Sequence, residues 1–215
     1  VIYTGSVTGL YKSADRGDHW KKRLNAAPLD GTVTSIAVSP KSRALVWVGT
    51  SAGRVYLFNN EEGTVKDRTG TNMPNRWVSE IVASQQDKNR AFVSFSGYDA
   101  NSMDTAHGGN GNAGKVFVTS DKGKHWTNMS GNLDGAHQMD VPISCLTVSP
   151  SSESTLWLGT DAGVWRTPDG GQNWTSFRGT MPVVAALDIE ANLQTGYLTV
   201  GTFGRGVWRT PLSEW

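Results

Sequence analysis

The octapeptide Ser13-Ala-Asp-Arg-Gly-Asp-His-Trp20 returns twice, as Thr119-Ser-Asp-Lys-Gly-Lys-His-Trp126 and as Thr167-Pro-Asp-Gly-Gly-Gln-Asn-Trp174. Each copy has the pattern Ser/Thr-x-Asp-x-Gly-x-x-Trp. An aspartate at this place accepts hydrogen bonds from backbone amides further along the chain, and a glycine two residues later permits a positive φ. The pattern therefore predicts three turns of one kind, with each tryptophan opening the next strand and folding back over its hairpin. The residues expected to have this structural role are Asp15, Gly17, Trp20, Asp121, Gly123, Trp126, Asp169, Gly171 and Trp174.

A second phrase, a Gly-Thr pair inside an apolar run, repeats in step with the octapeptides. It occurs at Gly49, Gly159 and Gly201, and Gly5 fits the same place. The spacing defines a repeated unit of about 40 residues, and short strands separated by turn signals at that period are typical of four-stranded β-propeller blades. The apolar runs 34–38, 144–148 and 185–189 are the innermost strands that this pattern predicts.

We therefore predict an all-β fold, a β-propeller of antiparallel blades with Asp-containing turns, in which about five blades form a single domain over residues 1–215. The expected blades span approximately residues 1–31, 32–75, 76–140, 141–182 and 183–215. In this register the first blade has no first strand and the last blade has no fourth. The register favours the C-terminal part of a larger propeller. A closed five-bladed ring with two thin blades is the alternative.

Composition excludes several classes of function. The 20 basic and 19 acidic side chains are dispersed along the chain, which gives no positive cluster for nucleic acid. No apolar stretch reaches the ~18 residues of a membrane-spanning helix, so we expect no membrane insertion. The one cysteine, Cys145, lies in an apolar strand without a Cys or His at metal-binding spacing. We therefore expect a buried thiol, no metal site and no cofactor, apart from calcium in the loop described next.

The stretch Gly97–Gly114 is rich in Gly and Asn and exceeds what a blade requires. Long loops on rigid scaffolds often carry function. Tyr98 is suited to stacking on a sugar, and the side-chain oxygens of Asp99, Asn101 and Asp104 are of the kind that calcium prefers. These four residues are the expected ligand contacts. Their spacing does not match an EF-hand, and the composition equally suits a plain hairpin.

The three octapeptides resemble Asp-boxes, also called bacterial neuraminidase repeats, and the whole chain resembles the propellers that carry them. Such propellers occur in sialidases, in xyloglucanases of the glycoside hydrolase 74 (GH74) type, in sortilin-type receptors and in photosystem assembly factors. The segments 159–174 and 201–208 look most like GH74-like or sortilin-like propellers of exported bacterial proteins. The resemblance implies the fold and an extracellular or cell-surface location. It is less specific for activity, because the motif lies away from the active centre in the families that have one.

The enzyme classes in this group make specific demands on the sequence. A sialidase needs clustered arginines and an early Arg-Ile-Pro segment, which the chain lacks. A xyloglucanase needs two carboxylates across a cleft. Asp188 is the one acid that we find in an apolar inner strand, and a solvated position in the central channel is its alternative role. The loop acids Asp99, Asp104, Asp134 and Asp140 are further candidates.

These observations favour a binding or interaction scaffold for a carbohydrate or protein partner. A missing N-terminal part of the same propeller, or a second copy of the chain, is a further candidate partner. A xyloglucanase-like glycoside hydrolase fragment is the alternative function. An assembly or sorting factor is the second alternative.

Overall fold

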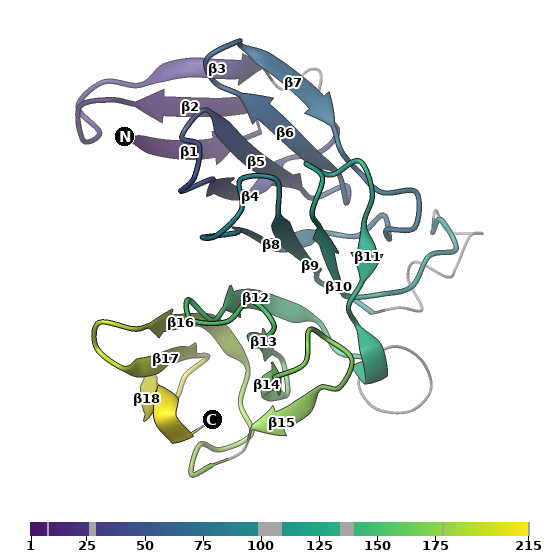
Figure 1. Cartoon of the computed structure of the whole chain (residues 1–215), viewed down its shortest axis with the longest axis vertical. Coiled ribbons are helices and arrows are strands. Elements are labelled where there is room, and N and C mark those ends of the chain that lie inside the picture. Colours follow the sequence, from purple (N-terminus) through teal and green to yellow (C-terminus); the bar gives the residue numbers. More distant parts are fainter. Residues whose placement is uncertain (8, 26–28, 99–108, 134–139, 178, 215) are drawn as a thin grey trace.

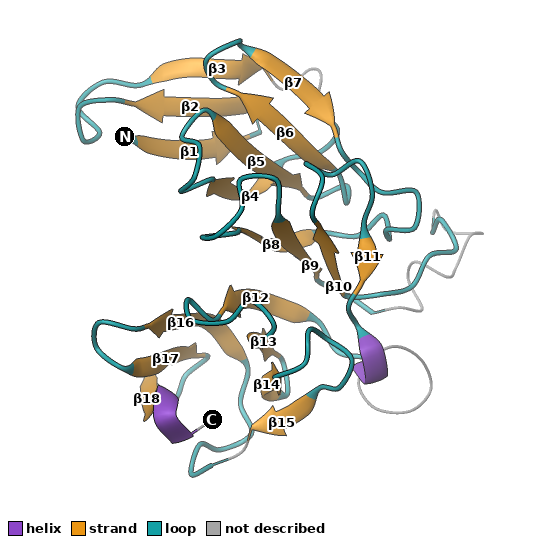
Figure 2. Cartoon of the chain, viewed as in Figure 1, coloured by secondary structure: helices purple, strands orange, loops and turns teal. Residues whose placement is uncertain are grey.

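The computed structural model describes the chain except for residues 8, 26–28, 99–108, 134–139, 178 and 215. In the described part, strands dominate and the helical elements are two short 3-10 helices, η2 (Gly131–Leu133) and η3 (Leu212–Glu214). Figure 2 shows this all-β character. Neither helix is long or apolar enough to cross a membrane.

Five antiparallel sheets follow one another along the chain (Figure 1). The first contains β1 (Ile2–Ser6), β2 (Gly9–Ser13) and β3 (Lys21–Asn25), and the second β4 (Val33–Val38), β5 (Leu45–Thr50), β6 (Val55–Asn59) and β7 (Thr64–Asp67). The third contains β8 (Val78–Ala83), β9 (Ala91–Phe95), β10 (Val116–Thr119) and β11 (Thr127–Asn128). The fourth contains β12 (Ile143–Val148), β13 (Leu156–Thr160), β14 (Gly163–Thr167) and β15 (Thr175–Phe177). The fifth contains β16 (Ala186–Asn192), β17 (Tyr197–Thr202) and β18 (Val207–Pro211).

The sheets are arranged as consecutive blades of a β-propeller, which confirms the predicted fold class. Neighbouring sheets contact one another through their inner strands, in the order β1, β4, β8, β12 and β16. The register identifies equivalent strands, because Gly5 pairs with Leu10 as Gly49 pairs with Val55. β1 is therefore a second strand, and the first sheet holds strands two to four. By the same register the fifth sheet holds strands one to three.

The first and fifth sheets stand at the two ends of an arc (Figure 1). Trp20 in the first sheet's turn is 42% exposed, and Val207 in the fifth sheet is 74% exposed. Such large apolar side chains are buried where two sheets meet. The closed five-bladed ring, our alternative for the architecture, is therefore not formed.

The core consists of four layers, one between each pair of neighbouring sheets. Since each middle sheet packs on both faces, its central strands are apolar in succession; all six residues of β5 are buried. Trp47 of β5 packs edge to face on Trp126 of the third sheet, with ring centroids 5.9 Å apart. These layers set where the strands end at the two faces of the arc.

Candidate functional site

The loops leave the arc on two opposite faces because the strands alternate in direction. The segments that precede first strands hydrogen-bond to the segments between second and third strands, as Trp77 O does with Ser96 N (2.9 Å). We call the side where these segments emerge the loop face. The turns between third and fourth strands emerge opposite, with Gly170 N bonded to Ser154 O (2.8 Å). We call that side the Asp-box face.

The Asp-box turns share one hydrogen-bond pattern. In the second box, the Thr119 hydroxyl donates to Asp121 Oδ1 (2.8 Å) and accepts from Gly123 N (2.9 Å). Asp121 Oδ1 also accepts from His125 N (3.0 Å). The first and third boxes repeat these bonds around Asp15 and Asp169. The geometry is that of a turn clamp, as the sequence analysis anticipated.

The second carboxylate oxygen of each box also has a partner. Asp15 Oδ2 lies 2.7 Å from His19 Nδ1, and Asp121 Oδ2 lies 2.6 Å from His125 Nδ1. In the third box, Asn173 donates to Asp169 Oδ2 instead (2.8 Å). The hydrogen bonds to both carboxylate oxygens stabilise the ionised form, with the Ser13 hydroxyl contributing most at Asp15 and the backbone N–H of His125 and of Asn173 contributing most at Asp121 and Asp169. They lower the pKa of Asp15 and Asp169 to about 2 and hold that of Asp121 well below its usual range. Carboxylates committed in this way are poor proton carriers, which supports a structural role for them.

The glycines of the boxes have the expected left-handed backbone, with φ of 108° at Gly17, 76° at Gly123 and 84° at Gly171. The residue before each glycine is left-handed as well. It is a second glycine, Gly170, in the third box, but a side chain is present at Arg16 (φ 66°) and Lys122 (φ 62°). The first two turns therefore carry backbone strain that the third does not.

The box tryptophans lie differently from the prediction that each folds over its own hairpin. Trp126 donates its indole N–H to Arg68 O of the preceding sheet (2.7 Å), and Trp174 donates to Met129 O (2.9 Å). Both rings are buried against that preceding sheet. The ring is drawn there because the neighbouring sheet offers apolar surface and an acceptor, which an isolated hairpin lacks. Trp20, at the end of the arc, lies over its own Gly17.

On the loop face, a single buried guanidinium closes the base of the 97–114 insertion. Arg76 Nη1 donates to Gly97 O (3.0 Å), and Nη2 donates to Gly114 O (2.6 Å). Lys115, whose side chain is fully buried, forms an ion pair with Asp140 (3.1 Å) beside this clamp. Asp140, one of the loop acids considered as catalytic, is thus engaged with a structural cation.

Two aromatic side chains are exposed next to the Arg76 clamp. Trp77, the residue before β8, is 51% exposed, and Tyr98 is 47% exposed. Arg76, Trp77, Ser96 and Gly97 line an open depression of about 420 Å³. Exposed aromatic rings beside a depression are typical of ligand-binding surfaces. The sequence predicts Tyr98 at this surface but not Trp77 or Arg76, although Trp77 directly precedes an apolar strand.

The other predicted loop ligands, Asp99, Asn101 and Asp104, and the loop acid Asp134, lie outside the described residues. Their contacts with calcium or a glycan therefore stay predictions. Among the residues that the structure does describe, no three His, Cys, Asp or Glu side chains are grouped closely enough to hold a metal ion.

Four side chains stand at one equivalent position in successive inner strands along the arc. Each stands at a β-bulge of a first strand, opposite Gly49, Ser94, Gly159 or Gly201 of the second strand: the four are Ser35, Glu80, Cys145 and Asp188. Asp188 was expected to be the one acid in an inner strand, and this expectation is wrong because Glu80 occupies the same place in β8. Cys145 is buried, as predicted, and burial raises the pKa of its thiol to about 12.

Glu80 is the half-buried acid of this row. Its Oε1 accepts a hydrogen bond from the Ser35 hydroxyl (3.2 Å). Burial raises the pKa of Glu80 to about 7, and the negative charge of Asp188 acts in the same direction against the hydrogen bonds from Ser35 and Ile81. A carboxyl group of this kind holds a proton near neutral pH, which is a property of general acids. Asp188 is exposed to solvent at the end of the row.

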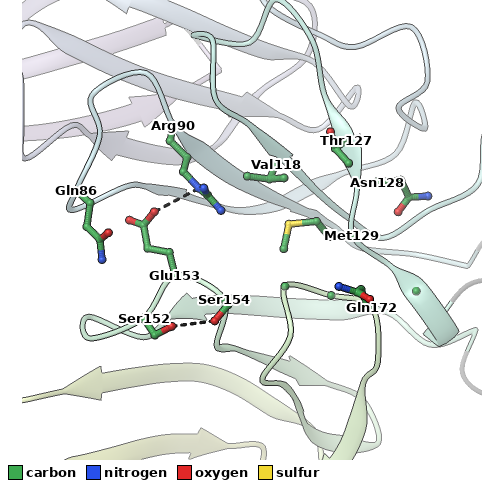
Figure 3. Close-up of a pocket in the computed structure, with 13 residues that line it drawn as sticks. Gln86, Arg90, Val118, Thr127, Asn128, Met129, Ser152, Glu153, Ser154 and Gln172 are labelled. Atoms are coloured by element: carbon green, nitrogen blue, oxygen red, sulfur yellow. Dashed lines mark hydrogen bonds and ion pairs between the residues drawn. The ribbon is translucent and has the colours of Figure 1, made fainter.

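A larger pocket, of about 660 Å³, lies on the Asp-box face between the third and fourth sheets (Figure 3). Arg90 and Glu153 form an ion pair across it (Nε to Oε2, 3.3 Å), and the Ser152 and Ser154 hydroxyls are 2.8 Å apart. Glu153 also accepts from the Ser84 hydroxyl (2.5 Å). The charges of Arg90 and Glu153 neutralise each other, and the ion pair links the third sheet to the fourth. We assign this pocket a structural role. We therefore take the loop face as the candidate site.

The fold and the turns define the class: the chain is an Asp-box β-propeller, as its resemblance implied, although no family model matches it. Among curated proteins it is similar to a xyloglucanase of Hypocrea jecorina, with 26% identity over 173 residues, 77% of this chain and 20% of that protein. It is also 36% identical over 73 residues to a probable oligoxyloglucan-reducing end-specific xyloglucanase of Neosartorya fischeri, which covers 33% of this chain and 9% of that protein.

Solved structures show the same fold. The GH74 enzyme of Niastella koreensis matches 97% of this chain over 33% of its own length, with a TM-score of 0.72 and 14% identity. The structure of YCF48 bound to D1 peptide matches 95% of this chain over 58% of its own length, with a TM-score of 0.61 and 14% identity. At these identities the match establishes architecture alone. The chain spans a fifth or less of the length of the curated relatives that it matches.

Proposed function

We propose that the protein is a carbohydrate-binding propeller whose loop face recognises a neutral β-glucan chain. The observation that carries the proposal is the exposed ring of Trp77, which lines the 420 Å³ depression, with the exposed Tyr98 next in sequence to the lining residue Gly97. The C–H faces of a pyranose ring are apolar, so they pack on aromatic rings while the hydroxyl groups stay in water. The Arg76 clamp holds the base of the insertion in place, which lowers the entropic cost of ordering a ligand there.

Two further observations support a neutral glucan as the ligand. The formal net charge of +1 with dispersed charges gives the surface no strong attraction for a polyanion. The curated relatives are named for xyloglucan, a neutral polysaccharide. Since such polymers lie outside the cytoplasm, the proposal includes an extracellular or cell-surface location, which fractionation of the source cells tests.

Isothermal titration with xyloglucan oligosaccharides and cellohexaose tests the binding function. Trp77→Ala should weaken binding by at least about ten-fold, equivalent to ~1.4 kcal/mol, and Tyr98→Ala should weaken it less. Trp20→Ala is the matched control, because that ring is similarly exposed but lies on the opposite face. Equal losses in Trp77→Ala and Trp20→Ala, or no binding by the native chain, would contradict the proposal.

Hydrolysis of the bound glucan is the second candidate function. It is favoured by the pairing of Glu80, protonated near neutral pH, with the solvent-exposed Asp188 in the same row. Most glycosidases act through two carboxyl groups that flank the scissile bond. Incubation with a β-glucan panel should then release reducing ends, and Glu80→Gln and Asp188→Asn should each abolish the release. Binding without release of reducing ends leaves the scaffold function alone.

A further inference from the structure

The outward face of the fifth sheet matches the faces that carry the next sheet elsewhere in the arc. The third-strand residue that pairs with the repeated second-strand position (Gly5, Gly49, Ser94, Gly159 and Gly201 in the five sheets) shows this directly. In the first four sheets it is Leu10, Val55, Val116 and Val164, each at most 1% exposed because the following sheet covers it. In the fifth sheet it is Val207, which is 74% exposed.

The glycine position leads to the same conclusion. A methyl group on Gly5, Gly49 or Gly159 would overlap the first strand of the following sheet, at Val33, Val78 and Ala186 respectively. Gly201 has the same place in the fifth sheet, yet the nearest atom to a methyl group there is Asp188 Cβ, at 3.7 Å. The fifth sheet thus has, at Gly201, the same missing side chain that lets the next first strand pack closely on the other sheets.

Asp188 occupies the place of a hydrogen-bond acceptor between sheets. In the second sheet, the Ser35 hydroxyl accepts from the backbone N–H of Ile81 in the next first strand (2.9 Å). In the fourth sheet, the equivalent Cys145 packs in one core layer with Ile189 of the next first strand. Asp188 stands at the same bulge position and is exposed. A carboxylate at this point is a stronger acceptor than either a hydroxyl or a thiol.

We propose that the outward face of β16–β18 binds a further propeller blade, whose first strand lies over Gly201 and donates a backbone N–H to Asp188. The residue over Gly201 should be small or β-branched, because Val33, Val78 and Ala186 fill that space in the other interfaces. Val183, Leu187 and Phe203, in or next to the strands of this sheet, are also exposed, at 71%, 48% and 72%. An uncovered patch of this kind marks an interaction surface.

A second copy of the chain does not meet these requirements. Its free sheet faces are those of β1–β3 and β16–β18. The strand nearest the axis in the first is β1, the equivalent of a second strand, and the first strand of the other, β16, already packs on Gly159 through Ala186. The three matching interfaces place a first strand over the glycine. The occupant that the geometry requires is therefore a blade with a complete first strand.

An extended chain tests the proposal. Residues 169–211 are appended after Pro211, so the junction Pro211-Asp repeats the natural Pro168-Asp169 step and supplies a fourth strand followed by a new first strand. Hydrogen exchange of the β17 amides should slow by at least about ten-fold relative to the native chain, with one cooperative thermal transition at higher temperature. Gly201→Leu should abolish this protection in the extended chain and leave the Tm of the native chain unchanged.

Three outcomes would overturn the proposal. The first is an appended unit that is degraded by protease without any protection of β17. The second is protection that persists in the Gly201→Leu extended chain, since the strand would then lie elsewhere. The third is a native dimer in light scattering that Val207→Asp dissociates, because the occupant would then be a second copy.

Variants of Asp188 test its role as the hydrogen-bond acceptor. Asp188→Ala should reduce the protection of β17 in the extended chain, whereas Asp188→Asn should retain most of it. An equal loss of protection in both variants would show that Asp188 is not the acceptor.

Discussion

The middle of the arc and its two ends contain the same local structures in different surroundings. The third box and the first box form the same hydrogen bonds around Asp169 and Asp15, yet Trp174 is 1% exposed and Trp20 is 42% exposed. The turn is therefore closed by its own residues, whereas the burial of its tryptophan depends on the preceding sheet. An Asp-box therefore has two separable roles: its Asp and Ser/Thr close the turn, and its Trp packs the sheet against the preceding one.

The largest expected effect separates these two tryptophans. Trp174→Ala should destabilise the fold by about 3–5 kcal/mol, because it leaves a cavity between two sheets and an unpaired Met129 carbonyl. Trp20→Ala should cost less than about 1.5 kcal/mol, since its ring is partly in water already. Urea unfolding of the two variants measures the difference. Equal destabilisation would show that Trp20 is as well packed as Trp174.

Glycines at the equivalent position sharpen the same comparison. Gly159→Ala should destabilise by about 1–3 kcal/mol, because the new methyl group overlaps Cys145 and the Ala186 carbonyl. Gly201→Ala places the methyl group in open space and should change stability by less than about 0.5 kcal/mol. Thermal unfolding at one pH is sufficient for this pair. A large loss in Gly201→Ala would mean that its face is covered.

Glu80, in the row formed by Ser35, Glu80, Cys145 and Asp188, makes the stability of the fold depend on pH. Its pKa is about 7 in the folded chain against an ordinary 4.5, so folding takes up a proton between these pH values. The stability that this group contributes is complete below about pH 4.5 and is lost as the pH rises through 7. Glu80→Gln should therefore raise the Tm more at pH 8 than at pH 5.

The end of the row provides the control for that prediction. The charge of Asp188 helps to raise the pKa of Glu80, so the gain from Glu80→Gln at pH 8 should be smaller in an Asp188→Asn background. If Glu80→Gln raised the Tm equally at pH 5 and at pH 8, Glu80 would not take up a proton on folding.

The smallest expected effect concerns backbone strain in the boxes. Lys122→Gly should stabilise by about 0.5–1 kcal/mol, because a glycine adopts the left-handed φ of 62° without a clash. Lys122→Ala is the matched control and should give no gain, since it keeps the Cβ atom. Gly170→Ala in the third box should cost a similar amount. Differential scanning calorimetry resolves changes of this size, and a gain in Lys122→Ala would assign the effect to charge instead.

The sequence was sufficient for the architecture because repetition constrains it strongly. The boxes gave the turns, and the shared register of Gly5, Gly49, Gly159 and Gly201 gave the strand order of both end sheets. Features that depend on neighbouring sheets were not predictable in this way. Glu80 was overlooked because its burial is created by strands more than 40 residues away, and the tryptophans were assigned to the wrong neighbour for the same reason.

The candidate site was only partly predictable for a related reason. The length and composition of the 97–114 stretch identified Tyr98, but Trp77 and Arg76 come from the segment before β8. They meet the insertion because Trp77 pairs with Ser96, a contact that sequence spacing alone does not reveal. A signal was nevertheless present, since Arg76 and Trp77 directly precede a strongly apolar strand.

The Arg76 clamp has a consequence for how such a protein can diversify. Because one guanidinium binds both Gly97 O and Gly114 O, the two ends of the insertion are fixed relative to each other whatever connects them. The entropic cost of a longer connection grows only slowly with its length. The connection between these two glycines can therefore change in length or sequence while the blades beneath keep their structure.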